Sequence, residues 1–141
     1  GIAAAPHLLT QLWLNNNELS GCIPSEIGQL TALQVLMLHN NHLTGELPTE
    51  LGCLQRLTEL NVENNQLNGP IPTEIGELQL LRLLNLRNNN ITGPVPASLC
   101  AMAELQHAIL ADNALEGPLP PGIFLLPKLW QVCVCSWMVL P

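Results

Sequence analysis

The sequence predicts an α/β repeat solenoid, a single domain in which stacked parallel β-strands form a concave face. Three observations predict it: a period of 24 residues, an alternating pair of apolar positions in each period, and columns of Asn, Gly and Pro at fixed distances from that pair. So many columns in one register indicate that each period is one structural unit stacked on the next. The 141 residues suffice for one domain, and an apolar content of 48% can supply a continuous core.

The leucine columns define the units and their strands. Five repeats of 24 residues start at Leu9, Leu33, Leu57, Leu81 and Leu105, with partial repeats at both ends of a single 1–141 domain. Within each repeat an L-x-L pair alternates, which predicts a short strand with two inward side chains. Stacking one such strand per repeat gives a parallel sheet with neighbours about 4.8 Å apart. The sheet curves because its strands pack more closely than the connecting segments opposite.

An Asn column follows each predicted strand, where the chain turns and its backbone polar groups would be buried without partners. Its members are Asn17, Asn41, Asn65, Asn89 and Asn113. An Asn amide both donates and accepts, so a stack of these side chains can bridge successive turns. The column is therefore interpreted as structural.

A second polar column directly precedes the first. It runs Asn16, Asn40, Asn64, Asn88 and then Asp112. Its members are interpreted as turn residues that tolerate left-handed backbone. The alternative is a regular polar array that matches a repetitive ligand, such as a polysaccharide or an ice lattice.

Gly and Pro columns complete each unit. The Gly column (such as Gly45) predicts a positive φ or a close approach of neighbouring coils, and the Pro column (such as Pro48) predicts an extended segment that begins a new turn.

The strings LSGCIPSEIGQL, LTGELPTELGCL and LNGPIPTEIGEL closely resemble the plant-specific leucine-rich-repeat class. That class includes receptor-like kinase ectodomains and polygalacturonase-inhibiting proteins, and the resemblance runs from Leu9 to about Leu129. It implies a right-handed superhelix with 3-10 or short helical segments on the convex face, and a second short β element beside the main sheet. Related repeats occur in algae and other protists, so the class does not identify the organism.

The chain departs from the pattern at several places. Cys100 and Phe124 replace a Gly, Ala108 replaces a core Leu, and Trp137 stands where a sixth Asn belongs. The cysteine-flanked caps that are usual in secreted members are missing. Both ends of the solenoid are therefore expected to expose edges of the core.

Charge restricts the partners. Eleven acidic residues stand against four basic ones, for a formal net charge of −7, which disfavours nucleic acid and favours a neutral or basic protein or peptide. The apolar stretch from Ile123 to Pro141 is interpreted as core sequence, so membrane contact is expected only through a larger complex. The spacing of the five cysteines predicts no intrachain disulfide, which weakens an extracellular assignment.

The candidate binding surface is the concave strand face, read from the positions between the leucines. The partner-binding candidates are Trp13, Met37, His39, Asn61, Glu63, Asn85 and Arg87. Trp13 and Met37, both expected to be exposed, resemble an interface anchor, or alternatively pack against a segment upstream. Glu63 and Arg87 lie on adjacent rungs and are expected to form a surface ion pair.

These features favour a non-catalytic recognition module that binds a protein or peptide through its concave face. No nucleophile–base pair or phosphate-binding motif is recognisable, no cofactor is expected, and His39 with His42 and Glu63 lacks the further ligands that a metal site needs. The alternative is a structural accessory subunit of a larger, membrane-associated or organellar assembly. It would dock through its uncapped ends, with Phe124, Trp130 and Trp137 as the interface.

The sequence features point to two alternative localisations. The resemblance implies an extracellular or cell-surface protein, and Asn90-Ile91-Thr92 forms a glycosylation sequon in what is expected to be an exposed turn. An intracellular or organellar setting is the alternative.

Overall fold

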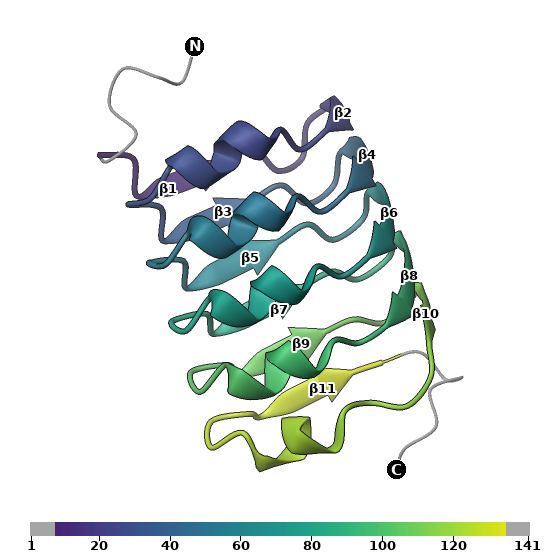
Figure 1. The fold of residues 1–141 in the computed structure, drawn as a ribbon. Helices are drawn as coiled ribbons and strands as arrows, with labels where there is room; N and C mark the ends of the chain where they lie inside the picture. Colours follow the sequence, from purple (N-terminus) through teal and green to yellow (C-terminus); the bar gives the residue numbers. More distant parts are fainter. Residues whose placement is uncertain (1–7, 135–141) are drawn as a thin grey trace.

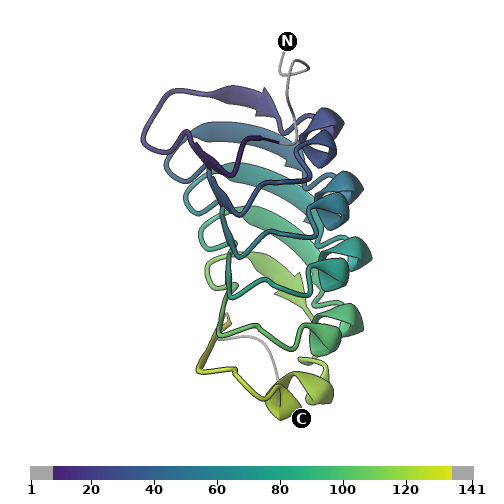
Figure 2. The same cartoon turned by 90° about the vertical axis from the view of Figure 1, so that its left-hand side faces the viewer.

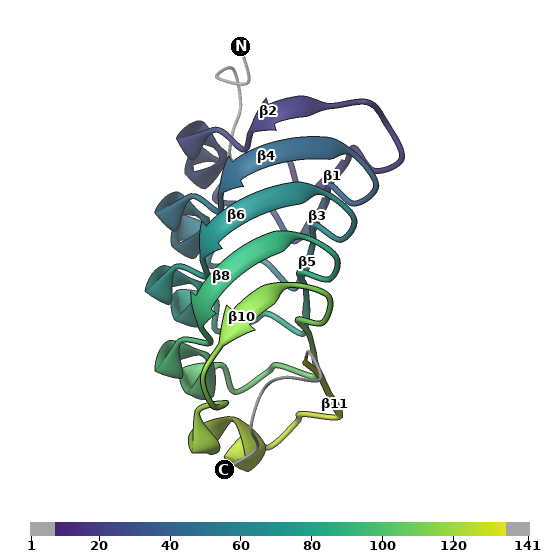
Figure 3. The same cartoon turned by 90° about the vertical axis from the view of Figure 1, so that its right-hand side faces the viewer.

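The computed structural model describes residues 8–134, which form a stack of similar coils (Figure 1). A complete coil contributes a strand to a main sheet, a strand to a second sheet and a five-residue 3-10 helix, in that order. The three elements form three sides of the solenoid, as the two side views of the stack in Figures 2 and 3 show. The architecture confirms the predicted α/β repeat solenoid.

The main sheet has six parallel strands in the order β1-β3-β5-β7-β9-β11. The strands are β1 (Gln11–Trp13), β3 (Val35–Met37), β5 (Glu59–Asn61), β7 (Leu83–Asn85), β9 (His107–Ile109) and β11 (Gln131–Cys133). Their register follows the sequence period, since Leu36 pairs with Leu60 and Leu60 with Leu84. Equivalent side chains of successive repeats therefore lie in columns across this sheet.

The second sheet, the side sheet, has five parallel strands in the order β10-β8-β6-β4-β2 (Figure 3). They are β2 (Ser20–Cys22), β4 (His42–Glu46), β6 (Gln66–Pro70), β8 (Asn90–Pro94) and β10 (Ala114–Glu116). Here Gly45 pairs with Leu67, a separation of 22 residues rather than 24. Each strand is thus displaced by two residues along its neighbour, and the columns of the side sheet run obliquely.

The 3-10 helices cover the third side of the solenoid. They are η1 (Ser25–Gln29), η2 (Thr49–Cys53), η3 (Thr73–Glu77), η4 (Ala97–Ala101) and η5 (Pro121–Leu125). Each follows a Pro with extended backbone, as at Pro72 with φ −66° and ψ 141°, which confirms the predicted role of the Pro column. A fixed φ and the missing N–H suit this entry point.

A single hydrophobic core runs through the stack. The inward leucines of the strands, such as Leu36, Leu60 and Leu84, are fully buried together with leucines and isoleucines of the other two sides. Ala108 is also fully buried, so the smaller residue keeps the core position. No helix within residues 8–134 has the length and apolarity needed to cross a membrane.

The inner Asn column bridges the coils as predicted. The Asn65 side-chain amide donates to the carbonyl oxygens of Leu38 and Val62, each at 3.0 Å, and its Oδ1 accepts from the Leu43 amide at 3.0 Å. One buried side chain thus satisfies backbone groups of two coils. Asn41, Asn89 and Asn113 donate in the same way.

The outer column adopts left-handed backbone, which confirms its interpretation as a turn. Asn16, Asn40, Asn64, Asn88 and Asp112 have φ between 51° and 57°. Their side chains also form a chain of their own, with Asn64 donating to Asn40 at 2.6 Å and Asn88 donating to Asn64 at 2.8 Å. The Gly column has positive φ as well, for example 77° at Gly45.

Replacing Asn65 by Leu is expected to lower the free energy of unfolding by about 2 kcal/mol, because buried backbone groups of two coils lose their partner. Chemical denaturation followed by circular dichroism measures the change. Gln66→Leu, at an exposed neighbouring position, is the matched control and should stay within about 0.5 kcal/mol of the parent. Equal stability of Asn65→Leu and the parent would refute this role of the column.

Candidate functional site

The outward side of the main sheet, with the residues that directly follow its strands, is the surface on which the predicted binding residues lie. We call it the main-sheet face. The 3-10 helices and the side sheet occupy the other two sides of the coil, so neither covers it (Figures 1 and 3). Adjacent coils bring the side chains of one column next to each other across this face.

The predicted apolar anchor is reduced to one residue. Trp13 on β1 is 60% exposed and its indole N–H donates to Gln11 Oε1 at 3.3 Å. Met37 is only 6% exposed, so the prediction of an exposed Trp–Met pair is wrong for Met37. Its column neighbours in the sheet are Trp13 and Asn61, and the flexible Met side chain packs down onto the sheet beside the larger Trp13.

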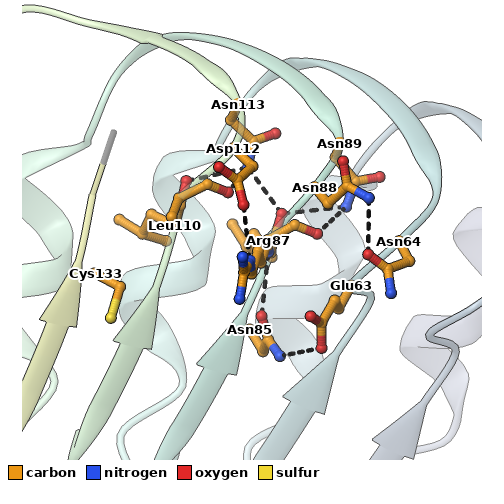
Figure 4. A network of polar contacts seen from close by, with 12 residues as sticks. Glu63, Asn64, Asn85, Arg87, Asn88, Asn89, Leu110, Asp112, Asn113 and Cys133 are labelled. Atoms are coloured by element: carbon orange, nitrogen blue, oxygen red, sulfur yellow. Dashed lines mark hydrogen bonds and ion pairs between the residues drawn. The ribbon is translucent and has the colours of Figure 1, made fainter. Parts of the chain in front are cut away.

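The predicted Glu63–Arg87 ion pair does not form. Arg87 Nε instead donates to Asp112 Oδ2 at 2.7 Å, and Glu63 Oε2 accepts from the Asn85 amide at 3.0 Å (Figure 4). The hydrogen bond to the Asp112 carboxylate, and then its charge, raise the pKa of Arg87. Arg87 thus pairs with the Asp112 carboxylate of the following coil and not with the Glu63 carboxylate of the preceding coil.

Asn61 and Asn85 fix the backbone beside the two charged residues. Asn61 Oδ1 accepts from the Glu63 amide at 3.0 Å, and Asn85 Oδ1 accepts from the Arg87 amide at 3.1 Å. Asn85 is buried, and its side-chain amide also donates to Glu63. The structure therefore brings Asn61, Glu63, Asn85 and Arg87 together into one polar network on adjacent strands.

His39 lies in the same column as Glu63, one coil earlier, and is half-buried. Its Nδ1 atom is buried and has no hydrogen-bond partner. Among the described residues no group of three or more His, Cys, Asp or Glu side chains is placed to hold a metal ion.

Asp112 is the residue of this network that the sequence analysis did not select. The available signal was the change from Asn to Asp at the fifth place of the outer column. Asp112 cannot donate to Asn88 as the earlier members donate to their predecessors, and it binds Arg87 instead.

The C-terminal end exposes a group of apolar side chains, which we call the end patch: Phe124, Leu125 and Trp130. Trp130 is 80% exposed and its ring meets His107 edge-on, with ring centroids 6.1 Å apart. Phe124 and Trp130 line a shallow groove of about 280 Å³. Trp137, the third residue predicted for this interface, lies outside the described residues.

One ion pair adjoins the end patch. Lys128 Nζ lies 2.7 Å from Glu104 Oε1, and this hydrogen bond lowers the pKa of Glu104. At the opposite end of the stack, Leu12, Leu14 and Leu19 line an open apolar pocket of about 130 Å³. Apolar surface is thus present at both ends of the described coils.

The sequon residue Asn90 is exposed and begins strand β8, and Thr92 is exposed on the same strand. The expectation of an exposed position is confirmed, and the expectation of a turn is wrong because the side sheet extends to Asn90. Cys22, Cys53, Cys100 and Cys133 are not bonded to one another, whereas Cys135 lies outside the described residues.

Comparisons with known proteins agree with this architecture. The family model described as "Leucine Rich Repeat" matches residues 8–30, 32–54, 56–78 and 80–102. The plant peptide hormone receptor RGFR1, solved in complex with RGF2, is 35% identical with a TM-score of 0.89, and the match covers 91% of this chain and 20% of that one. No curated protein sequence matches the chain significantly.

Two further solved structures show the breadth of the similarity. The ectodomain of the Arabidopsis thaliana receptor kinase GASSHO1/SCHENGEN3, in complex with CASPARIAN STRIP INTEGRITY FACTOR 2, is 38% identical with a TM-score of 0.87, over 93% of this chain and 16% of that one. A leucine-rich-repeat protein of Leptospira interrogans is 34% identical with a TM-score of 0.80, and the match covers 96% of this chain and 34% of that one. The chain spans only 20% and 16% of the lengths of the two plant receptor chains.

Asp112→Asn is expected to release the Arg87 guanidinium, because a charge-assisted hydrogen bond is lost. The substituted amide matches the Asn at this place in four preceding coils, so the fold should be retained. Solvent exchange of the Arg87 Nε–H proton, measured by NMR, should be slower than that of Arg56 in the parent and equal to it in the variant. An exchange rate at Arg87 that the substitution leaves unchanged would contradict the assigned ion pair.

Proposed function

Because this chain belongs to the leucine-rich-repeat family and carries the plant-type form of its motif, we propose that it is a non-catalytic recognition module that holds an extended peptide or protein segment on the main-sheet face. The proposed contact residues are Trp13, His39, Asn61, Glu63, Asn85 and Arg87, with the buried Met37 next to Trp13 on the adjacent strand. The fold is typical of binding modules rather than of enzymes. Two of the similar structures are complexes of receptors with RGF2 and with CASPARIAN STRIP INTEGRITY FACTOR 2.

The observation that carries the proposal is that the polar groups of this face are held in place by one another. Glu63 is held by Asn85, and Arg87 is held by Asp112, each across a gap between strands (Figure 4). Side chains that are already ordered lose little entropy when a partner arrives, which favours affinity. An extended segment that crosses the strands would meet these groups in succession.

The charge of the face supports a neutral or basic partner. Arg87 is neutralised by Asp112, whereas Glu59 and Glu63 take part in neither ion pair of the described residues. An excess of carboxylates remains on β5 and directly after it. A cationic side chain of the partner would compensate it.

A structural accessory subunit docked through its ends is the second candidate, and the exposure of the end patch favours it. Trp130 and Leu125 are 80% and 84% exposed. Exposed apolar patches mark interaction sites, and aromatic side chains such as Trp are enriched in protein interfaces. Affinity would then come from burying the end of the core. The main-sheet face would be left free.

Selection of displayed peptides on the immobilised chain, followed by calorimetry, tests the first proposal. The double variant Trp13→Ala with Glu63→Lys is expected to lower the affinity of the selected peptides about tenfold or more, because it removes the aromatic anchor and reverses a contact charge.

The matched control is Trp130→Ala with Glu77→Lys, which makes the same two chemical changes at the end patch and on η3. Its affinity should remain within about twofold of the parent. The opposite pattern, in which only the control loses affinity, would reject the main-sheet face and favour the end patch.

The native mass of gently purified material, measured by light scattering after size exclusion, should correspond to a monomer if the chain is a recognition module awaiting its ligand. Stoichiometric co-elution with a large assembly would instead support the accessory subunit. In that case Trp130→Ala should release the chain from the assembly, since the anchor of the end patch is removed.

A further inference from the structure

A groove lies on a side of the solenoid that the proposed function does not use. It follows the connections from β4, β6 and β8 to the 3-10 helices after them, visible in Figure 3 where the arrowheads of the side sheet turn toward the helices. Its volume is about 460 Å³, larger than the grooves at either end of the stack. It crosses three coils, a span of about 10 Å at the usual strand spacing.

Two stacked Pro-x-Pro segments line the groove, with Pro70 and Pro72 in one coil and Pro94 and Pro96 in the next. Pro72 and Pro96 have extended backbone, with ψ of 141° and 139°. Proline carries no N–H, so these segments offer ring surfaces and carbonyl oxygens but few donors. A ligand rich in acceptors would find little to bind there.

Two carboxylates stand on the rim, those of the exposed Glu46 and the half-buried Glu74. Neither belongs to an ion pair within residues 8–134, and no Lys or Arg is among the described residues that line the groove. The Thr73 hydroxyl donates to Glu74 Oε2 at 3.3 Å, so its proton is already used and it offers a ligand no free donor. The rim is therefore anionic and uncompensated.

Gly69 makes room for one of these acids. A Cβ atom at Gly69 would lie 2.5 Å from Glu46 Cγ and 2.7 Å from its Oε1, so the Glu46 side chain lies directly over the glycine. The absence of a side chain at Gly69 thus lets the carboxylate of one coil reach the next. Glu46 is held close to the Pro70 edge of the groove by this packing.

We propose that this groove is a docking site for a basic, extended segment of a partner polypeptide, three or four residues long, which places Arg or Lys side chains against Glu46 and Glu74. Cationic head groups supply the donors that the groove lacks, and their aliphatic stems pack on the proline rings. A span of about 10 Å matches three or four extended residues. The site is independent of the main-sheet face.

Charge argues against a second copy of the chain as the occupant. Each copy has a net charge of −7 with four basic residues, and Arg87 and Lys128 are already ion-paired. Two such surfaces repel each other at low ionic strength. The complementary partner is a different, basic chain.

The test is an NMR titration of the isotope-labelled chain with an end-blocked hexapeptide of alternating arginine and leucine, with its glutamate-for-arginine counterpart as the ligand control. Saturable shifts are expected for the amides of Leu47, Ile71 and Thr73, and none with the acidic peptide. Glu46→Gln with Glu74→Gln should weaken binding about fivefold, as expected for two partly exposed charge pairs.

Glu26→Gln with Glu77→Gln is the matched control, since it removes the same two charges from the helical side away from the groove. Its affinity should stay within about twofold of the parent. Equal weakening by both double variants would show attraction to net charge alone and would overturn the proposal. Shifts confined to β5 and β7, or no saturable shifts at all, would overturn it as well.

Discussion

The buried Asn column is the interaction on which the rest of the structure depends. Each coil turns inward after its main-sheet strand, and there the backbone leaves the regular ladder while still inside the molecule. Asn65 satisfies carbonyl oxygens of two coils and one amide, and its equivalents repeat the arrangement along the stack. Because this side chain fixes the distance and rotation between coils, the leucines meet in one core and the outward residues meet in columns.

Most of the fold was predictable because it depends on residues that recur. The period, the parallel main sheet and the left-handed turn at Asn64 follow from positions that have the same surroundings in every coil. The two-residue offset of the side sheet was not predictable, since it reflects how oblique strands settle against each other rather than any one residue type. The expectation that Asn90 lies in a turn was wrong because strand β8 already begins at this residue.

The candidate site was less predictable because its geometry depends on choices between neighbours. The columns correctly brought Asn61, Glu63, Asn85 and Arg87 together, yet spacing alone could not decide which acid Arg87 would bind. Arg87 binds Asp112 of the following coil, with a donor–acceptor distance of 2.7 Å. The burial of Met37 also depended on how far a flexible side chain packs down onto the sheet, which a repeat pattern does not encode.

The outer Asn chain has a direction. Each amide donates to the coil before it, from Asn88 to Asn64 to Asn40 to Asn16. The row therefore ends at the Asn16 amide, a donor, on one side and at the Asp112 carboxylate, an acceptor, on the other. Within each of the two sheets, all strands are also parallel. The two ends of the stack are therefore chemically different surfaces. Copies joined by extending these ladders would line up head to tail as an open filament, whereas a two-fold dimer through one end would interrupt both.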